Sequence, residues 1–180
     1  MKLFKKWAER EYSLPLRIFA SLLAGLLFAF LFPYVLARVA PVADRKLGLP
    51  SIGYGTATWI AGGILLLIGL IYALWSILAQ LFRARGTPLP MMATQKLLVS
   101  GPFRQCRNPM TFGTILLYLG IGIIAGSITA VAAVLLFAAL LVLYIKAIEE
   151  KELEARFGEE YQAYKKQTPF LIPRLWPPKS

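Results

Sequence analysis

The stretch MTFGTILLYLGIGIIAGSITAVAAVLLFAALLVLY, residues Met110–Tyr144, contains no charged residue and is too long to cross a lipid bilayer only once. A crossing helix needs about 20 apolar residues, and somewhat fewer can suffice. Gly126 and Ser127 divide the stretch, because Gly readily ends a helix and Ser is a favourable N-cap for the next one. We therefore predict two membrane helices, at residues 110–125 and 128–145, joined by a tight hairpin.

Two further apolar blocks precede this stretch, at residues 18–39 and 56–82. The chain has 180 residues, of which 58% are hydrophobic, and a mean hydropathy of +0.62. These values lie above those of a soluble domain. We predict an all-α polytopic protein, a single membrane domain of residues 1–180 with four transmembrane helices. The alternative has three crossings, with the third block only partly inserted.

The basic residues favour four crossings. Five of them lie in segment 1–17, five in 83–109 and seven in 146–180, so four crossings place 17 of the 20 on one side. The positive-inside rule makes that side cytoplasmic, with both chain termini there. Three crossings would put the seven basic tail residues outside. We expect a prokaryotic inner membrane rather than the endoplasmic reticulum, with the basic segment 1–17 lying in the lipid interface.

The same distribution explains the net charge of +11. Topology and attraction to anionic membrane lipids account for it, so we expect no nucleic acid partner. The chain has no histidine, and Cys106 is its only cysteine. We therefore expect no metal site and no haem. Any chemistry must use carboxylates, Arg, Lys, Tyr, backbone groups and a bound cofactor.

Residues suited to chemistry gather in the segments 83–109 and 146–180, on the predicted cytoplasmic side. The stretch Gly86–Gly113 is basic, rich in Gly and Pro, and free of acidic residues. The tail carries the acidic run EEKELEARFGEEYQAY. A small membrane protein with this arrangement is expected to be an enzyme whose bound species carries both signs of charge.

These segments resemble those of the isoprenylcysteine carboxyl methyltransferases and related phospholipid methyltransferases. That family shows roughly G-P-Y-R-x-x-R-H-P-x-Y-x-G, then a helix with paired Glu residues and F-G-x-x-Y-x-x-Y. The matching residues here are Leu98 to Arg104, Arg107 to Met110, Gly113, Glu149, Glu150, Leu153, Phe157 to Tyr161, Tyr164, Pro173 and Arg174. The resemblance covers about the C-terminal half, Gly86 to Arg174.

Three positions depart from the family pattern. Asn108 stands where His is usual, Thr111 and Phe103 where Tyr is common. Asn keeps a donor and an acceptor but does not titrate near neutral pH. A binding role for this position therefore survives, and a role in proton transfer does not.

The resemblance implies that S-adenosylmethionine binds at the cytoplasmic ends of the last two helices. Glu149 or Glu150 would hold its ammonium, and Arg107 at the start of the third helix would attract a carboxylate. The structural alternatives are surface pairs such as Lys146 with Glu150, and a simple cap by Asn108 and Pro109. We predict Arg107 and Glu150 as catalytic residues. The predicted cofactor-binding residues are Leu98, Val99, Gly101, Phe103, Arg107, Asn108, Pro109, Gly113, Glu149, Glu150 and Tyr161.

Some of these residues have a second interpretation. Gly113, like Gly120 and Gly122, is also suited to helix packing, which we prefer for the latter two. Tyr161 and Tyr164 would close over the cofactor or rest at the head-group level. Gly158 is expected to end or bend the long helix.

The predicted reaction is in-line methyl transfer to a lipid-borne or lipophilic acceptor, with membrane lipids as partners. Without histidine, a carboxylate acceptor of the isoprenylcysteine type is favoured over a phospholipid ethanolamine, whose amine must lose a proton. Two other classes remain open: a nicotinamide-dependent membrane reductase and a non-catalytic membrane scaffold.

Overall fold

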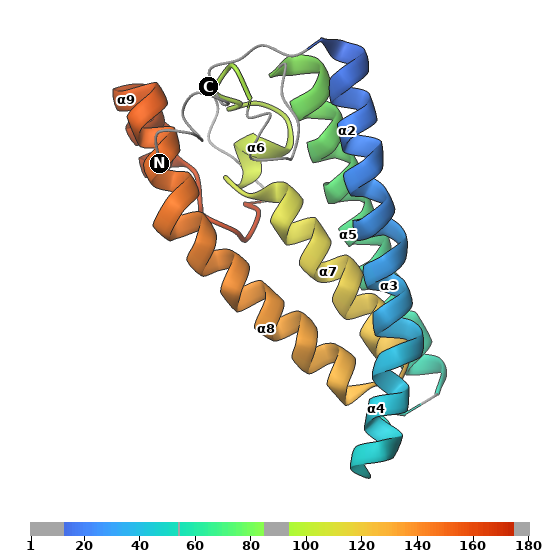
Figure 1. Cartoon of the computed structure of the whole chain (residues 1–180). Coiled ribbons are helices and arrows are strands. Elements are labelled where there is room, and N and C mark those ends of the chain that lie inside the picture. Colours follow the sequence, from blue (N-terminus) through green and yellow to red (C-terminus); the bar gives the residue numbers. More distant parts are fainter. Residues whose placement is uncertain (1–12, 54, 85–93, 175–180) are drawn as a thin grey trace.

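The structure is a computed structural model that describes residues 13–53, 55–84 and 94–174. Every regular element in these ranges is a helix and none is a strand, which confirms the all-α prediction (Figure 1). Most of the predicted interfacial segment 1–17 and the segment around Pro88 and Pro90 lie outside the described residues.

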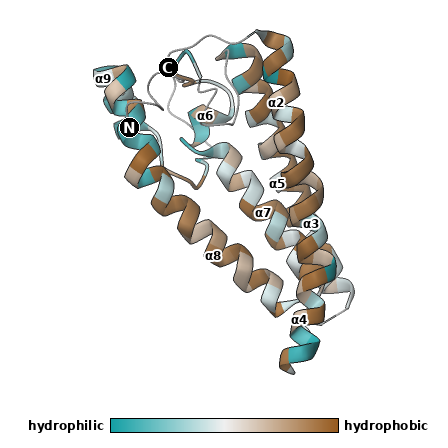
Figure 2. Ribbon diagram, in the orientation of Figure 1, coloured by the Kyte–Doolittle hydropathy of each residue, from teal (hydrophilic) through white to brown (hydrophobic). Residues whose placement is uncertain are grey.

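Long apolar helices dominate the fold. In the described part of the chain, three are long and apolar enough to cross a membrane: Leu14–Leu47, Thr56–Arg83 and Ile128–Gln167. Pro109–Ile124 is a shorter apolar helix. Hydrophobic residues cover the middle of the bundle, whereas α6, α9 and the end of α4 are hydrophilic (Figure 2). These helices fit an integral membrane protein.

The first long helix consists of α2 (Leu14–Leu26), η1 (Leu27–Leu31), α3 (Phe32–Tyr34), η2 (Val35–Val39) and α4 (Ala40–Leu47). Pro33 lies in its middle but does not end it, because the chain passes this point in π-helical turns. The Phe32 amide donates to the Leu27 carbonyl, five residues back. The helix ends at Gly48, whose φ of 67° is left-handed.

Glycine faces join α5 (Thr56–Arg83) to α7 (Pro109–Ile124). A Cβ on Gly69 would lie 2.3 Å from the Leu117 nitrogen, and one on Gly120 would lie 2.6 Å from the Gly62 carbonyl oxygen. Neither backbone can yield that space, so only glycine permits this approach. Small residues of this kind let membrane helices pack backbone to backbone.

A turn at Gly126, with φ 63°, joins α7 to α8 (Ile128–Tyr144). The Ser127 hydroxyl accepts a hydrogen bond from the Ala130 amide, the capping role expected from the sequence. Asp44 of α4 accepts hydrogen bonds from the Ser127 hydroxyl and from the amide and hydroxyl of Thr129. This carboxylate therefore fixes the first long helix to the hairpin.

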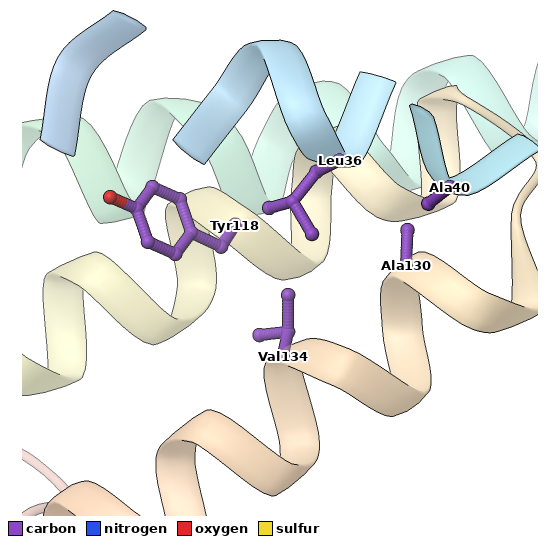
Figure 3. Packing of buried hydrophobic residues seen from close by; sticks show 5 residues of the cluster. All are labelled: Leu36, Ala40, Tyr118, Ala130 and Val134. Carbon is purple, nitrogen blue, oxygen red and sulfur yellow. The ribbon is translucent and has the colours of Figure 1, made fainter. Parts of the chain in front are cut away.

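A hydrophobic cluster lies next to this turn. Leu36 and Ala40 from the first long helix meet Tyr118 of α7, and Ala130 and Val134 of α8 (Figure 3).

From the turn onward α8 diverges from α7 (Figure 1). It continues without a break through η4 (Ile145–Glu149) into α9 (Glu150–Gln167). The short helix α6 (Pro102–Gln105) and the start of α7 thus face α9 across the wide end of the bundle.

Candidate functional site

An ion pair connects the two segments that the sequence singled out. Arg107, just before α7, donates from Nη2 to Glu150 Oε1 at 2.7 Å. The two side chains are 9% and 8% exposed. Arg107 Nη1 also donates to the Lys165 carbonyl at 3.0 Å. Arg107 Nε is buried and has no hydrogen-bond partner, so one donor at this site is free.

The second oxygen of Glu150 pairs with a residue that was not among the predicted site residues. Lys165 Nζ lies 2.9 Å from Glu150 Oε2 and 2.9 Å from Glu154 Oε1. The alternative prediction from helical spacing, a surface ion pair between Lys146 and Glu150, is therefore wrong. Lys146 Nζ instead lies 4.9 Å from the centre of the Phe170 ring.

A kink at Gly158 brings Lys165 to Glu150. In a straight α-helix, residues 150 and 165 would be about 22 Å apart along the axis. Gly158 has φ 53° and ψ −127°, a conformation that glycine adopts far more easily than other residues. This confirms the expected bend at Gly158. The glycine at 158 therefore indicated a bend, but it did not indicate which residue the bend would bring back to Glu150.

The segment after α9 folds back over the start of α7. The Arg107 amide donates to the Pro169 carbonyl at 2.9 Å, and Asn108 Nδ2 donates to the Phe170 carbonyl at 2.9 Å. The Phe170 ring lies 5.7 Å from the Arg107 guanidinium carbon. Asn108 is at the N-cap of α7, but its side chain makes no capping bond. The cap expected from its side chain is thus absent, because the amide holds the returning segment instead.

Four of the predicted cofactor-binding residues lie near the C-terminal end of α5. Leu98 and Phe103 are buried against Ala79 and Ala84. Val99 is 46% exposed. Gly101 has φ 62°, and a Cβ there would lie 3.3 Å from Arg83 Nη1. The Tyr164 hydroxyl donates to the Phe103 carbonyl at 2.5 Å, which joins this group to α9, the helix that carries Glu150.

The other predicted residues divide between the site and the helix interface. Pro109 is buried in the first turn of α7. Gly113 faces α5, where a Cβ would lie 2.6 Å from the Ala73 nitrogen. The packing role left open for Gly113 accounts for its position. Tyr161 is 2% exposed and contacts Tyr164, which is also buried. Neither tyrosine is therefore a surface aromatic at the head-group level.

Glu149 differs electrostatically from its neighbour. It lies four residues beyond the apolar segment that ends at 145, and its side chain makes no hydrogen bond or ion pair with another described residue. Burial, and then the charges of Glu152 and Glu150, raise its pKa to about 7. Glu149 can therefore exchange a proton near neutral pH, which no histidine here can do.

Cys106 has no comparable reactivity. Its side chain is fully buried, and burial raises the pKa of the thiol to about 12. A thiol in that state is a poor nucleophile. Within the described residues no group of His, Cys, Asp and Glu side chains is placed to hold a metal ion.

The charges at the site suit an amino acid zwitterion. Glu150 already binds an ammonium, that of Lys165, and Arg107 keeps a buried donor that matches a carboxylate.

In comparisons with known proteins, the family model described as phospholipid methyltransferase matches residues 57–160, more than half of the chain. No curated protein matches the chain. No solved structure matches it either.

Proposed function

The chain belongs to the phospholipid methyltransferase family, and on this premise we propose that it uses S-adenosylmethionine to methylate a lipid-borne acceptor at the cytoplasmic membrane face. Family membership and the apolar helices make it a membrane methyltransferase. The donor, the acceptor and the residues below are the proposal. The observation that carries it is the buried pair of Arg107 and Glu150.

The residues present fit the amino acid end of S-adenosylmethionine. When bound, this molecule supplies a methyl group on a positively charged sulfur. Glu150 would hold its ammonium and Arg107 Nε its carboxylate, each as a charge-assisted hydrogen bond. Asn108 and Pro109 fix the backbone around Arg107, and Tyr161 is buried in the returning part of α9 against Tyr164. These residues would position the donor and exclude water.

The first candidate acceptor is a lipophilic carboxylate of the isoprenylcysteine type. A carboxylate is already a nucleophile at neutral pH, so this reaction needs no base. The side chain of Asn108 is engaged with the backbone of Phe170, and it cannot titrate. A lipophilic acceptor would reach the site between α7 and α8, which diverge toward this end of the bundle.

A second candidate is the amine of a phospholipid ethanolamine head group. The observation that favours it is Glu149, whose pKa of about 7 suits a proton acceptor. In this case Glu149 would remove the proton that the amine must lose, and Glu150 would keep its binding role. The two acceptors therefore differ in their need for Glu149.

Isothermal titration calorimetry of S-adenosylmethionine into the detergent-purified protein tests the donor. We expect saturable binding that is lost in Glu150→Ala and Arg107→Ala and retained in Glu159→Ala, an exposed residue of α9. If a folded wild-type protein does not bind the donor, with or without lipid, the proposal fails. That result would favour the two other classes, a nicotinamide-dependent membrane reductase and a non-catalytic membrane scaffold.

Methyl transfer from labelled S-adenosylmethionine separates the two acceptors. One assay offers an N-acetylated S-farnesylcysteine and the other offers vesicles that contain phosphatidylethanolamine. Glu149→Gln should leave transfer to the carboxylate intact, and it should slow transfer to the amine. Equal loss with both acceptors would show that Glu149 acts in binding rather than in proton transfer.

A further inference from the structure

Lys165 occupies the place that the proposed function assigns to the ligand ammonium. Its Nζ lies 2.9 Å from Glu150 Oε2, and the Arg107 guanidinium occupies Oε1. Both carboxylate oxygens therefore already hold a cation without any ligand. A second ammonium of the same chemistry must displace one of the two cations or share its oxygen.

Lys165 is the cation that can leave. Its side chain is 37% exposed, whereas the Arg107 side chain is 9% exposed and makes one further hydrogen bond, to the Lys165 carbonyl. Lys165 also has a second anion in reach, because Glu154 Oε1 lies 2.9 Å from the same Nζ. If the lysine ammonium moved away from Glu150 toward Glu154, it would still be paired with a carboxylate.

We propose that Lys165 is an internal competitor for the ligand ammonium at Glu150, and that it thereby sets how tightly ligands with an α-ammonium bind. This inference rests on the proposed function. Lys165 contacts Glu150 when no ligand is bound and pairs with Glu154 alone when the ligand ammonium arrives. It affects only ligands that carry an ammonium, so it is a specificity-determining residue.

The charges remain paired in both states. Without ligand, Arg107 and Lys165 neutralise Glu150 and Glu154. With ligand, Arg107 would pair with the carboxylate, Glu150 with the ammonium, and Lys165 with Glu154. Hydrogen bonds to Glu150 and Glu154 raise the pKa of Lys165, so the competing charge persists at neutral pH.

The test measures binding of two ligands by calorimetry. S-adenosylmethionine carries the ammonium, whereas 5′-methylthioadenosine keeps the nucleoside and lacks the amino acid end. We expect Lys165→Met to bind S-adenosylmethionine about two- to fivefold tighter, the factor that a partly exposed ion pair represents. Its affinity for 5′-methylthioadenosine should not change. Lys166→Met removes an exposed neighbouring lysine and should alter neither affinity.

Glu154→Gln supplies a second variant with the opposite expectation. It removes the alternative partner of Lys165, so the lysine should hold Glu150 more firmly and weaken S-adenosylmethionine binding. Thermal unfolding of each variant verifies that the protein is folded. Weaker binding by Lys165→Met, or an equal change for both ligands, would overturn the competitor role and leave the proposed function standing. No binding by wild type would overturn both.

Discussion

The Tyr118 hydroxyl donates a hydrogen bond to the Phe28 carbonyl at 2.6 Å, across 90 residues of sequence. In the π-helical register around Leu27, the amide that would serve this carbonyl belongs to residue 33. Residue 33 is proline and has no N–H. The tyrosine of α7 therefore supplies the donor that the first long helix lacks.

We expect Tyr118→Phe to destabilise the protein by about 1–2 kcal/mol, because an unpaired carbonyl inside an apolar bundle is unfavourable. Thermal unfolding in detergent measures the change. Tyr34→Phe is the control, since Tyr34 is 61% exposed. In a Pro33→Ala background the new amide can serve Phe28, so Tyr118→Phe should then be less harmful. Equal losses in both backgrounds would contradict this explanation.

A second prediction concerns the glycine interface between α5 and α7. Gly69→Ala should cost about 2 kcal/mol or more, because its new methyl group would meet the backbone of Leu117. Gly63→Ala is the matched control in the same helix, with nothing within 4 Å of the added atom. It should be neutral or stabilise the helix by up to about 1 kcal/mol. If both variants unfold at the same temperature, the close packing is not important for stability.

Periodicity, charge and helix-ending residues made much of this fold predictable from the sequence. The break at Gly126 and Ser127 is local chemistry, and so is the capping role of Ser127. Each of these two inferences needed only the residue types and their order. The expectation that Arg107 and Glu150 lie at one site came instead from the resemblance to the methyltransferase family, because the charges alone fit an ordinary solvated helix surface equally well.

Other features depend on geometry that the sequence does not show. A glycine at 158 predicts a bend but not its direction, and the direction decides that Lys165 meets Glu150. Pro33 predicts a disturbed helix, but it does not indicate that Tyr118 of a distant helix donates to the carbonyl that the proline leaves without an amide. Gly113 fits a ligand site or a helix interface equally well until α5 is placed against it.

A third prediction separates charge from shape at Arg107. Its guanidinium binds the Glu150 carboxylate and the Lys165 carbonyl at once, which a lysine ammonium on a flexible stem reproduces poorly. Arg107→Lys should therefore weaken S-adenosylmethionine binding roughly ten- to a hundredfold, the effect of one lost charge-assisted bond. Calorimetry measures this, with the exposed Arg174→Lys as control. Unchanged affinity would mean that positive charge alone suffices.

A fourth prediction tests the kink in α9. Gly158→Ala should destabilise the protein by about 1–2 kcal/mol, because φ 53° is strained for a residue with a Cβ. A clash with other parts of the protein is not the cause, since nothing lies within 4 Å of the added atom beyond the residue's own chain neighbours. Gly25→Ala has equally open surroundings and an ordinary helical backbone, so it should be tolerated. Similar melting temperatures for the two variants would contradict a strained kink.

The last prediction concerns Glu149 and pH. Its pKa in the folded protein, about 7, lies above the ordinary 4.5, so the folded state holds this proton more tightly than the unfolded chain. Stability from this group is therefore lost as pH rises from about 4.5 to about 7, and it levels off above that range. Glu149→Gln removes this pH-dependent loss of stability, because a glutamine side chain does not ionise. The variant should match wild type near pH 4.5 and exceed its stability at pH 8, by an amount on the order of 2 kcal/mol.

Thermal unfolding of both proteins across this pH range in one detergent measures the difference between them. Glu159→Gln, an exposed residue of the same helix, controls for the loss of one negative charge. Because other carboxylates titrate in both proteins, the informative quantity is the difference at each pH. It should grow between pH 4.5 and 7 for Glu149→Gln and stay flat for Glu159→Gln. A constant offset at every pH would show that folding does not shift the pKa of Glu149, and it would remove the observation that favours an amine acceptor.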